Sequence, residues 1–282
     1  MRLAPLLDAE IVSVDSMQVY RGMDVGTAKP TPEQRQDVPH HMLDLVEPDV
    51  EFSVAEFQEA GRRAIAAVRD RGRSVLVVGG SGLHLRALVD PLEFAPHDPA
   101  IRAEVEALDA AAAVRELLSL DPAAGAHLDL ANPRRVTRAL EVSRIGAGTP
   151  SERATSRSAA AVRAYQALIP FSGVVIDPGE GLAARARRRI DRMLKAGLLD
   201  EVERIGPRLG RTASQAVGYK EMLPVVAGDL TLSDGAADVL TATTALARRQ
   251  RTFFRRDPRL VEVPWTSTFE DRVSSVHEAL TS

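Results

Sequence analysis

The chain of 282 residues contains no cysteine. This absence excludes disulfides, thiolate nucleophiles and cysteine-rich zinc sites, and nothing in the composition points to an oxidising compartment. Long apolar runs are absent too, since no uninterrupted stretch reaches the ~18 residues that a membrane helix needs. The opening residues, MRLAPLLDAE, lack the apolar core of a signal peptide. We therefore expect a cytoplasmic protein.

Lysine is scarce, and most of the positive charge comes from arginine. The net charge of -3 argues against a generally basic nucleic-acid coat, but the arginines cluster at 134–144, 185–192 and 248–259. One cluster alone is equally well explained as solvated helix surface with acidic partners. Three clusters together favour contact with RNA, because phosphate neutralisation needs only a local basic stripe.

Two buried-type strands predict a parallel sheet. Residues 10–14 (EIVSV) and 74–78 (SVLVV) are short apolar runs. Between them, Ser53 and Glu56 form a capping box that begins a predicted helix over about 53–71. Strand, helix and strand in this order predict an α/β fold, in which ligands bind beyond the carboxyl ends of the strands.

A helical insertion is expected within this sheet. Residues from about 91 to 151 have Ala-rich helical patterning, and a third apolar run follows at 167–176. We therefore expect an α/β core over residues 1–95 and 162–282, and a helical insertion domain over 96–161.

The segment 151–161 (SERATSRSAAA) is small, polar and weakly periodic. This composition predicts a mobile connection. The last third of the chain is again helical, with helices expected at about 182–205 and 234–255.

Asp15 is a candidate for chemistry because of its position. It follows a buried strand, where reduced solvation in a cleft would raise its basicity and suit a general base. The alternative is that Asp15 caps the next turn, a common role for an aspartate at the end of a strand. The loop from Ser16 to Pro30 is rich in hydrogen-bond donors and poor in core residues. Such a loop is more often functional than structural.

The turn after the second strand is Gly79-Gly80-Ser81-Gly82. It would let backbone amides and a hydroxyl approach an anionic group at the start of a helix. The alternative is that the glycines serve the geometry of the turn only, as in many strand-to-helix connections.

His40 and His41 raise the question of a metal site. Adjacent side chains on an extended segment point to opposite faces, and the sequence offers no further ligand cluster. We therefore interpret both histidines as structural or substrate-lining and assign no metal ligand.

Six ordered motifs resemble those of a known family. They are SVDSMQVYRGMDVGTAKP, Pro39-His40-His41, VVGGSGL, NPRRVTRALEV, AVGYKE and ARRQRTFFRRD. The chain is identified by them as a member of the tRNA dimethylallyltransferase (tRNA isopentenyltransferase) family of bacterial type, over about residues 8 to 258. The resemblance implies a P-loop-NTPase-like parallel sheet with flanking helices and a helical insertion domain that grips tRNA.

The activity of the family is implied for this chain. The family transfers a dimethylallyl group from dimethylallyl diphosphate to N6 of adenine 37 in tRNA and releases diphosphate. The implied partners are the tRNA anticodon stem-loop and dimethylallyl diphosphate, with Mg²⁺ as cofactor and a monomer as the acting species. The P-loop-type sheet also places the family among nucleotide-binding and ATP-binding proteins.

Single residues match functional positions of the family. Asp15 matches the residue that accepts a proton or hydrogen bond from the adenine amine. Ser81 replaces the usual threonine and keeps a hydroxyl that can contact the diphosphate or the reacting adenosine. Arg185 and Arg189 lie on one helix face and match two arginines, one of which binds diphosphate in relatives. The matched tRNA-contact positions are Asp15, Ser16, Met17, Gln18, Ser81, Arg102, Arg134, Arg135, Val136, Thr137, Arg138, Gln215, Ala216, Val217, Gly218, Tyr219 and Lys220.

One family element has no counterpart in the sequence. Relatives carry a strand and a phosphate-binding loop, G-x-x-x-x-G-K-[ST], about 15 residues before the SVDS strand, whereas this chain has no Gly-Lys pair. That loop would supply a lysine for the diphosphate and a hydroxyl for Mg²⁺. Either the start codon was placed too far downstream, or the chain is a truncated, inactive descendant. Because the missing strand is central in related sheets, we expect a groove lined by unpaired backbone groups.

Three other functions compete with the transferase. An adenylate prenyltransferase acting on free nucleotide would need neither the helical insertion nor the arginine clusters. A non-catalytic tRNA-binding relative is compatible with the missing loop. A small-molecule kinase with a P-loop fits the sheet but not the motifs AVGYKE and NPRRVTRALEV.

Overall fold

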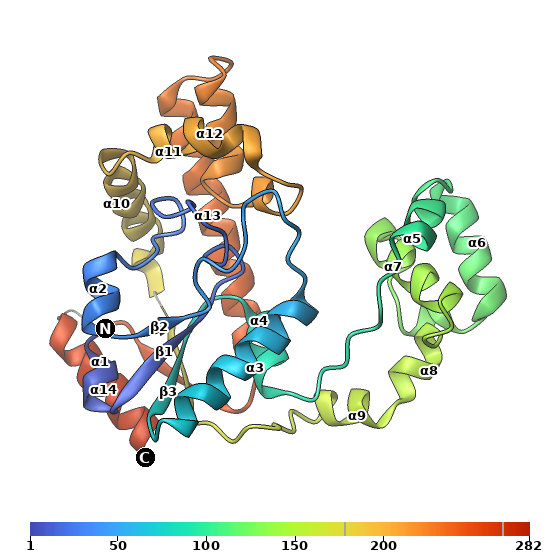
Figure 1. The fold of residues 1–282 in the computed structure, drawn as a ribbon, viewed down its shortest axis with the longest axis horizontal. Coiled ribbons are helices and arrows are strands. Elements are labelled where there is room, and N and C mark those ends of the chain that lie inside the picture. Colours follow the sequence, from blue (N-terminus) through green and yellow to red (C-terminus); the bar gives the residue numbers. More distant parts are fainter. Residues whose placement is uncertain (178, 267) are drawn as a thin grey trace. The chain divides into compact units, whose positions relative to one another are not determined.

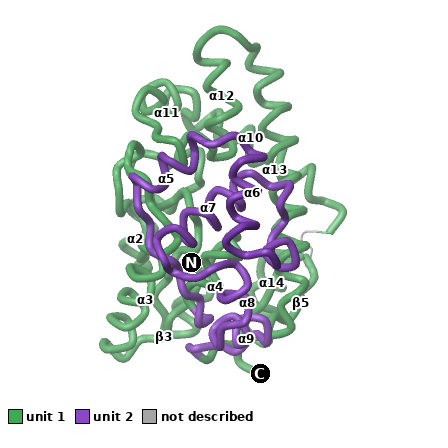
Figure 2. Tube along the Cα trace, turned by 90° about the vertical axis from the view of Figure 1, so that its right-hand side faces the viewer, with its two compact units in different colours: residues 1–88, 170–282 green, residues 89–169 purple. Residues whose placement is uncertain are grey.

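The computed structural model describes residues 1–177, 179–266 and 268–282. The chain divides into two compact units, residues 1–88 with 170–282, and residues 89–169 (Figure 2). The second unit contains the whole of the expected insertion, 96–161, with several residues on either side. Within the described ranges, no helix combines the length and the apolar character needed to cross a membrane.

A parallel three-stranded sheet lies in the first unit (Figure 1). Its central strand, β1 (Ala9–Val14), is buried along its whole length and pairs with β2 (His40–His41) on one side and β3 (Ser74–Gly79) on the other. The register places Val14 opposite Gly79, so both strands end together. The predicted strands over 10–14 and 74–78 and the α/β class are confirmed.

A second, two-stranded parallel sheet is formed by β4 (Gly173–Asp177) and β5 (Leu260–Pro264). Only the last part of the apolar run 167–176 is therefore strand. Among the described strands, β3 pairs only with β1, and β4 pairs only with β5. The described strands thus form two separate sheets. The strands β3 and β4 each pair with a neighbouring strand on one side only.

Helices surround these sheets in the first unit. They are α1 (Leu3–Leu6), α2 (Pro32–Asp37), α3 (Val54–Asp70), α4 (Gly82–Val89), α10 (Leu182–Lys195), α11 (Leu198–Ile205), α12 (Tyr219–Val226), α13 (Leu232–Phe254) and α14 (Phe269–Thr281), with short 3-10 turns at Gly179–Gly181, Gly206–Arg208 and Ala213–Gln215. The predicted capping box is present, because Ser53 accepts the N–H of Glu56 and the Glu56 side chain accepts the N–H of Ser53. The helix expected over 182–205 is broken into α10 and α11 by Gly197, whose φ of 92° lies in the left-handed region.

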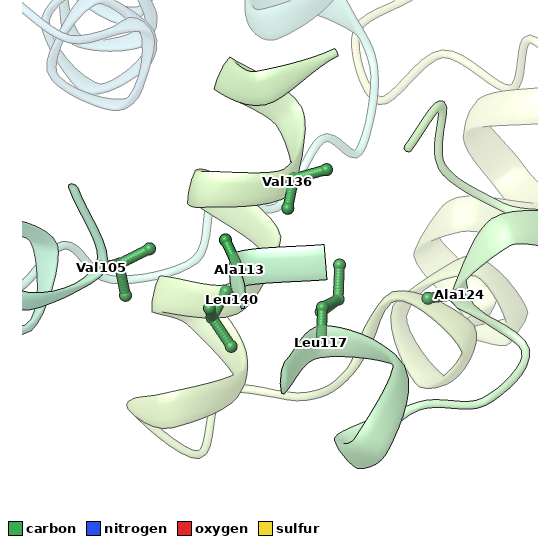
Figure 3. Packing of buried hydrophobic residues seen from close by; sticks show 6 residues of the cluster. All are labelled: Val105, Ala113, Leu117, Ala124, Val136 and Leu140. Atoms are coloured by element: carbon green, nitrogen blue, oxygen red, sulfur yellow. The ribbon is translucent and has the colours of Figure 1, made fainter. Parts of the chain in front are cut away.

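The second unit is a small bundle of helices with its own core. Its helices are α5 (Pro99–Glu106), α6 (Ala110–Leu120), α7 (Pro133–Arg144), α8 (Pro150–Thr155) and α9 (Arg157–Arg163), with a 3-10 turn at Ala124–Ala126. The apolar faces of α5, α6 and α7 meet in a buried cluster (Figure 3). This core consists of Val105, Ala113, Leu117, Ala124, Val136 and Leu140.

The prediction of a mobile connection at 151–161 is wrong, because the segment is helical. Thr149 makes a capping box with Glu152, and Pro150 occupies the first turn of α8. The hydroxyl of Ser156 then accepts the N–H of Ala159 and begins α9. These polar residues act as helix caps rather than as a flexible linker.

Candidate active site

A cleft of about 1250 Å³ opens in the first unit beyond the carboxyl ends of β1 and β3. Asp15 and Ser81 line it from the strand ends, and Arg185 and Arg189 line it from α10. Ser16, Met17 and the segment 215–218 complete the predicted site residues on its walls. Segments distant in sequence are therefore brought together, at the edge of the sheet where the α/β fold predicts ligand binding.

The carboxylate of Asp15 faces this cleft and also holds its own turn. Its Oδ1 accepts the backbone N–H of Met17 at 2.8 Å. The capping role considered as an alternative is therefore present, and it occupies one of the two carboxylate oxygens. A turn of this kind fixes the side chain in one orientation toward the cleft.

Glu201 organises the loop that follows Asp15. This carboxylate on α11 is 5% exposed. Its oxygens accept the backbone N–H groups of Asp24 and Val25 at 2.9 Å and of Gly26 at 3.0 Å. Three consecutive N–H groups aimed at one carboxylate form an anion nest within the protein. The loop is thereby tied to a helix far away in the sequence.

Tyr219 completes this arrangement from α12. Its hydroxyl donates to Glu201 at 2.5 Å, and the side chain is fully buried. Burial, then the hydrogen bond with Glu201, raises the pKa of Tyr219. A Cβ at Gly26 would lie 2.4 Å from the Tyr219 ring, so only glycine fits there. The conformation of the loop thus depends on the fit of these three residues.

Lys29, the last charged residue of the loop, is structural. Its side chain is fully buried, and Nζ lies 2.7 Å from the carbonyl of Tyr20 and from carboxylate oxygens of Asp24 and Asp44. Gln18, one of the matched tRNA-contact residues, donates to the carbonyl of Thr27 at 3.1 Å. The donor-rich loop therefore uses much of its hydrogen-bonding capacity on itself.

The glycine turn after β3 is shaped by close packing. A Cβ at Gly79 would lie 2.1 Å from the carbonyl oxygen of Val14, and one at Gly82 would lie 2.2 Å from the Phe253 ring. A side chain at Gly79 or Gly82 would clash with these neighbours, so the packing of the turn requires glycine at both positions. Gly82 also lines the cleft next to Ser81, so the turn contributes to the site as well.

A positively charged wall is formed by α10. Besides Arg185 and Arg189, it brings Arg188, Arg192 and Lys195 to the lining of the cleft. Burial, followed by repulsion from Arg188 and Arg272, lowers the pKa of Arg185. Its guanidinium also lies 4.3 Å from the ring centre of Trp265. Such a wall favours an anionic ligand.

A metal ion would find few ligands on the protein. The carboxylates on the walls of the cleft are those of Asp15 and Asp191. In the part of the chain that the structure describes, no group of three or more His, Cys, Asp or Glu side chains is placed to hold a metal. The described residues therefore do not make a Mg²⁺ site by themselves.

The two adjacent histidines have local partners. Nε2 of His41 lies 2.6 Å from Glu10, and Nδ1 of His40 lies 2.7 Å from the carbonyl of Val38. Glu10 is also paired with Arg71 at 2.6 Å. The two contacts of Glu10 tie β2 and the end of α3 to the central strand, whereas the contact of His40 is local. Both histidines thus have structural partners.

The C-terminal arginine cluster is divided between two roles. Arg251 and Arg255 pair with Asp177 at 2.6 and 3.0 Å, which joins α13 to β4. Arg249 and Gln250 instead line the cleft. Ion pairing thus explains part of this cluster, as the solvated-surface alternative proposed.

In the second unit, Glu141 gathers two of the matched tRNA-contact arginines. This carboxylate is fully buried. It lies 2.9 Å from Arg138, 3.4 Å from Arg102 and 2.5 Å from Nδ1 of His97, and it accepts the N–H of Asp98 at 3.2 Å. Although burial opposes ionisation, these partners lower the pKa of Glu141 to about 2. The arginines are therefore anchored by a buried negative charge.

A hollow of about 620 Å³ lies beside this cluster in the same unit. Arg134, Arg135, Arg138 and Arg153 line it, together with Asn132. Arg134 and Arg135 are exposed at the start of α7. Their guanidinium groups are available to an anionic partner such as an RNA backbone.

Two of the matched tRNA-contact residues are buried in the structure. Val136 is 2% exposed, and its side chain belongs to the core of the second unit. Tyr219 is fully buried and bonded to Glu201, so its role is to hold the loop. The adjacent residues Arg135 and Lys220 are exposed, because a helix turns successive residues toward different surroundings.

Sequence reasoning missed three residues that contact predicted site residues: Glu201, Glu141 and His84, whose Nδ1 lies 2.6 Å from Oγ of Ser81. Each is an ordinary helical residue in the sequence. The local signals were weak: Glu141 follows Arg138 at a helical spacing, and His84 follows Ser81 by three positions. Nothing local marks Glu201.

The sequence of the chain is similar to those of known proteins. Residues 18–257 match the family model described as IPP transferase. The chain is 44% identical over 273 residues to a tRNA dimethylallyltransferase of Streptomyces avermitilis, covering 94% of this chain and 84% of that protein. It is 40% identical over 257 residues to a tRNA dimethylallyltransferase of Bifidobacterium longum, covering 89% of this chain and 76% of that protein.

Solved structures show the same likeness. A tRNA isopentenylpyrophosphate transferase from Bacillus halodurans has a TM-score of 0.68 and 34% identity, covering 99% of this chain and 89% of that one. A eukaryotic dimethylallyltransferase acting on tRNA shares the fold with a TM-score of 0.75 at 23% identity, covering 96% of this chain and 72% of that one. The cleft, the motifs and these matches lead to one conclusion: the chain belongs to the IPP transferase family.

Proposed function

We propose that this chain transfers a dimethylallyl group from dimethylallyl diphosphate to N6 of adenine 37 in tRNA and releases diphosphate. The observation that carries the proposal is the cleft in which Asp15 faces the arginines of α10. The transfer needs a group that takes a proton from the amine and a surface that neutralises the leaving diphosphate. Both kinds of group line this cleft.

The roles of the residues follow from the chemistry. As the N6–C bond forms, the C–O bond breaks, and its electron pair leaves with the diphosphate. The amine proton passes to Asp15, which is held in orientation by the N–H of Met17. Arg185 and Arg189 stabilise the charge that grows on the diphosphate oxygens.

Magnesium has a limited place in this proposal. Mg²⁺ prefers octahedral oxygen ligands and keeps several waters, using one or two carboxylates together with substrate phosphates. Because the described residues do not form a metal site, an accompanying Mg²⁺ would take its ligands mainly from the diphosphate and water. We derive no step from it.

Recognition of the RNA requires an accessible base. Adenine 37 is stacked in the anticodon loop, so its amine reaches a cleft only after the base is extruded, at a cost of a few kcal/mol. Favourable contacts to the RNA backbone offset the free-energy cost of extruding the base. We assign such contacts to Arg134 and Arg135 of the helical unit, and to the cleft residues Ser16 and Gln215. We expect the enzyme to act as a monomer in the cytoplasm.

One assay tests the proposed function. The protein is incubated with an unmodified tRNA transcript, dimethylallyl diphosphate and Mg²⁺, and the nucleosides are analysed by mass spectrometry for N6-dimethylallyladenosine. Formation of N6-dimethylallyladenosine when tRNA is the only acceptor supports the transferase. Tight tRNA binding without product favours a non-catalytic relative, and prenylation of free AMP favours an adenylate prenyltransferase.

A further inference from the structure

Trp265, the single tryptophan of the chain, lies at the end of a strand beside the cleft. It directly follows β5, whose last residue, Pro264, pairs with Asp177 at the end of β4. Its side chain lines the cleft and is 42% exposed. The residue also lies beyond the range 18–257 that matches the family model. Neither the motifs nor the proposed chemistry gives this ring a role.

Two guanidinium groups lie over the Trp265 ring. Cζ of Arg185 is 4.3 Å from the ring centre, and Cζ of Arg272 on α14 is 4.4 Å from it. Both distances are within the ~6 Å over which the face of an aromatic ring attracts a cation. Arg272 also donates from Nη1 to the carbonyl of Thr266 at 2.7 Å. The helix α14 therefore anchors the segment that carries the ring.

Positive charge surrounds Arg185. The residue lies in the first turn of α10, at the positive end of the helix dipole. Arg188 and Arg272 repel its guanidinium, and together with burial they lower the pKa of Arg185. Repulsion of this kind drives a long, flexible side chain toward solvent and away from a defined position. The face of the Trp265 ring attracts the guanidinium and offsets that repulsion.

Packing also limits where the Arg185 guanidinium lies. A Cβ at Gly181 would be 2.4 Å from Nη1 of Arg185, so the guanidinium runs back along α10 and lies directly against the glycine. The same group contacts the Trp265 ring. A side chain that two neighbours already confine loses less conformational entropy when it binds a ligand. The cation is thus preorganised in the wall of the cleft.

We propose that Trp265 is a positioning residue that holds the Arg185 guanidinium in the wall of the cleft for an incoming diphosphate. The ring acts through Arg185, because the negative face of an aromatic ring does not attract an anion. This inference rests on the proposed function, which supplies the diphosphate as the ligand. A ring that instead stacks on the target adenine is an outcome that the test distinguishes.

Tryptophan fluorescence tests the proposal directly, because the chain has one tryptophan. The wild-type protein is titrated with inorganic diphosphate at constant ionic strength, and calorimetry measures binding in parallel. We expect a saturable change in emission, since the bound anion alters the charge next to the ring. Arg185→Ala should abolish most of this change, whereas Arg187→Ala, outside the lining of the cleft, should retain it. Diphosphate that binds without changing the emission would overturn the proposal.

Variants of Trp265 test the positioning itself. Trp265→Leu, which removes the aromatic face, should raise the dissociation constant for inorganic diphosphate about tenfold in calorimetry. Trp265→Phe keeps an aromatic face and should stay within about threefold of the wild type. In an Arg185→Ala background, Trp265→Leu should cause no further loss, because the ring then has no Arg185 to hold. Urea unfolding checks that each variant is folded, and the fluorescence titration decides independently because it leaves Trp265 in place.

Steady-state kinetics separates the remaining outcomes. Trp265→Leu should raise KM for dimethylallyl diphosphate and leave KM for tRNA nearly unchanged. The reverse pattern would reject the proposal and place the adenine on the ring. Losses that add to those of Arg185→Ala, or an unchanged diphosphate affinity in Trp265→Leu, would also reject it. Diphosphate binding that depends on Trp265 in a protein that does not prenylate tRNA would reject the proposed function and leave this inference standing, whereas a wild type that binds no diphosphate would overturn both.

Discussion

The hydroxyl of Tyr219 donates to the buried carboxylate of Glu201 at 2.5 Å, and this pair holds the loop beside the cleft. The carboxylate also accepts three backbone N–H groups from residues 24–26. No neutral side chain of the same shape can accept all four bonds, because an amide presents N–H groups on one of its two ends. The loop therefore depends on one negative charge.

Glu201→Gln should destabilise the protein by about 2 kcal/mol, since the loop no longer has a charged acceptor and some of its donors face an amide N–H₂. Urea denaturation monitored by circular dichroism measures the change. The matched control is Glu203→Gln on the same helix, where the side chain is exposed, and it should change stability very little. Equal effects of the two variants would contradict the role assigned to Glu201.

Asp15→Asn should lower turnover of tRNA by about 10²-fold or more while leaving tRNA affinity nearly unchanged. Asparagine keeps an oxygen for the N–H of Met17, so the turn is retained while the proton acceptor is removed. Single-turnover prenylation and filter binding measure the two quantities. Asp191→Asn, the other carboxylate lining the cleft, is the control. Near-normal turnover in Asp15→Asn would remove Asp15 from the mechanism.

Arg189→Ala should reduce kcat/KM for dimethylallyl diphosphate by about 10²-fold, because one donor to the developing charge on the diphosphate is removed. Affinity for tRNA should change much less. Steady-state kinetics with each substrate varied in turn measures both effects. Arg187→Ala, on the same helix but not among the residues that line the cleft, serves as control, and a similar decrease there would point to a general charge effect.

The stability of the protein should depend on pH through Glu141. Its folded-state pKa of about 2 lies below the usual value of 4.5, so its contribution is present above pH 4.5 and is lost as the pH falls toward 2. The shift corresponds to about 3 kcal/mol. Urea unfolding of the wild type and Glu141→Gln should show a difference in stability that shrinks over this range. A difference that does not vary with pH would contradict the ionised state of Glu141.

Arg134→Ala combined with Arg135→Ala should weaken binding of the anticodon stem-loop. The salt dependence of binding should also fall, by about one unit of slope for each phosphate that an arginine no longer neutralises. Fluorescence anisotropy at several salt concentrations measures both effects. Arg115→Ala, an exposed arginine of α6 in the same unit, is the control. An unchanged salt slope in the double variant would place the RNA elsewhere.

Local patterns in the sequence were sufficient for several elements. Each apolar run, at 10–14 and at 74–78, and the Ser53 capping box is made by residues that are close together in the sequence. The interactions that form these elements can therefore be recognised from the sequence alone. The family motifs likewise led to Asp15, Ser81 and the arginines of α10. At 151–161, small polar residues were misread because serine and threonine favour both loops and helix caps.

By itself, the sequence determined the family, the strands that end shortly before Asp15 and Ser81, and the basic character of α10. Only the tertiary structure decided which acidic residues are buried and what they hold. Glu201 reaches a loop that lies 175 to 177 residues earlier in the chain, and Glu141 reaches His97 across 44 residues. Many glutamates share the same local pattern, and a carboxylate becomes an organising charge only where folding removes it from water and surrounds it with donors.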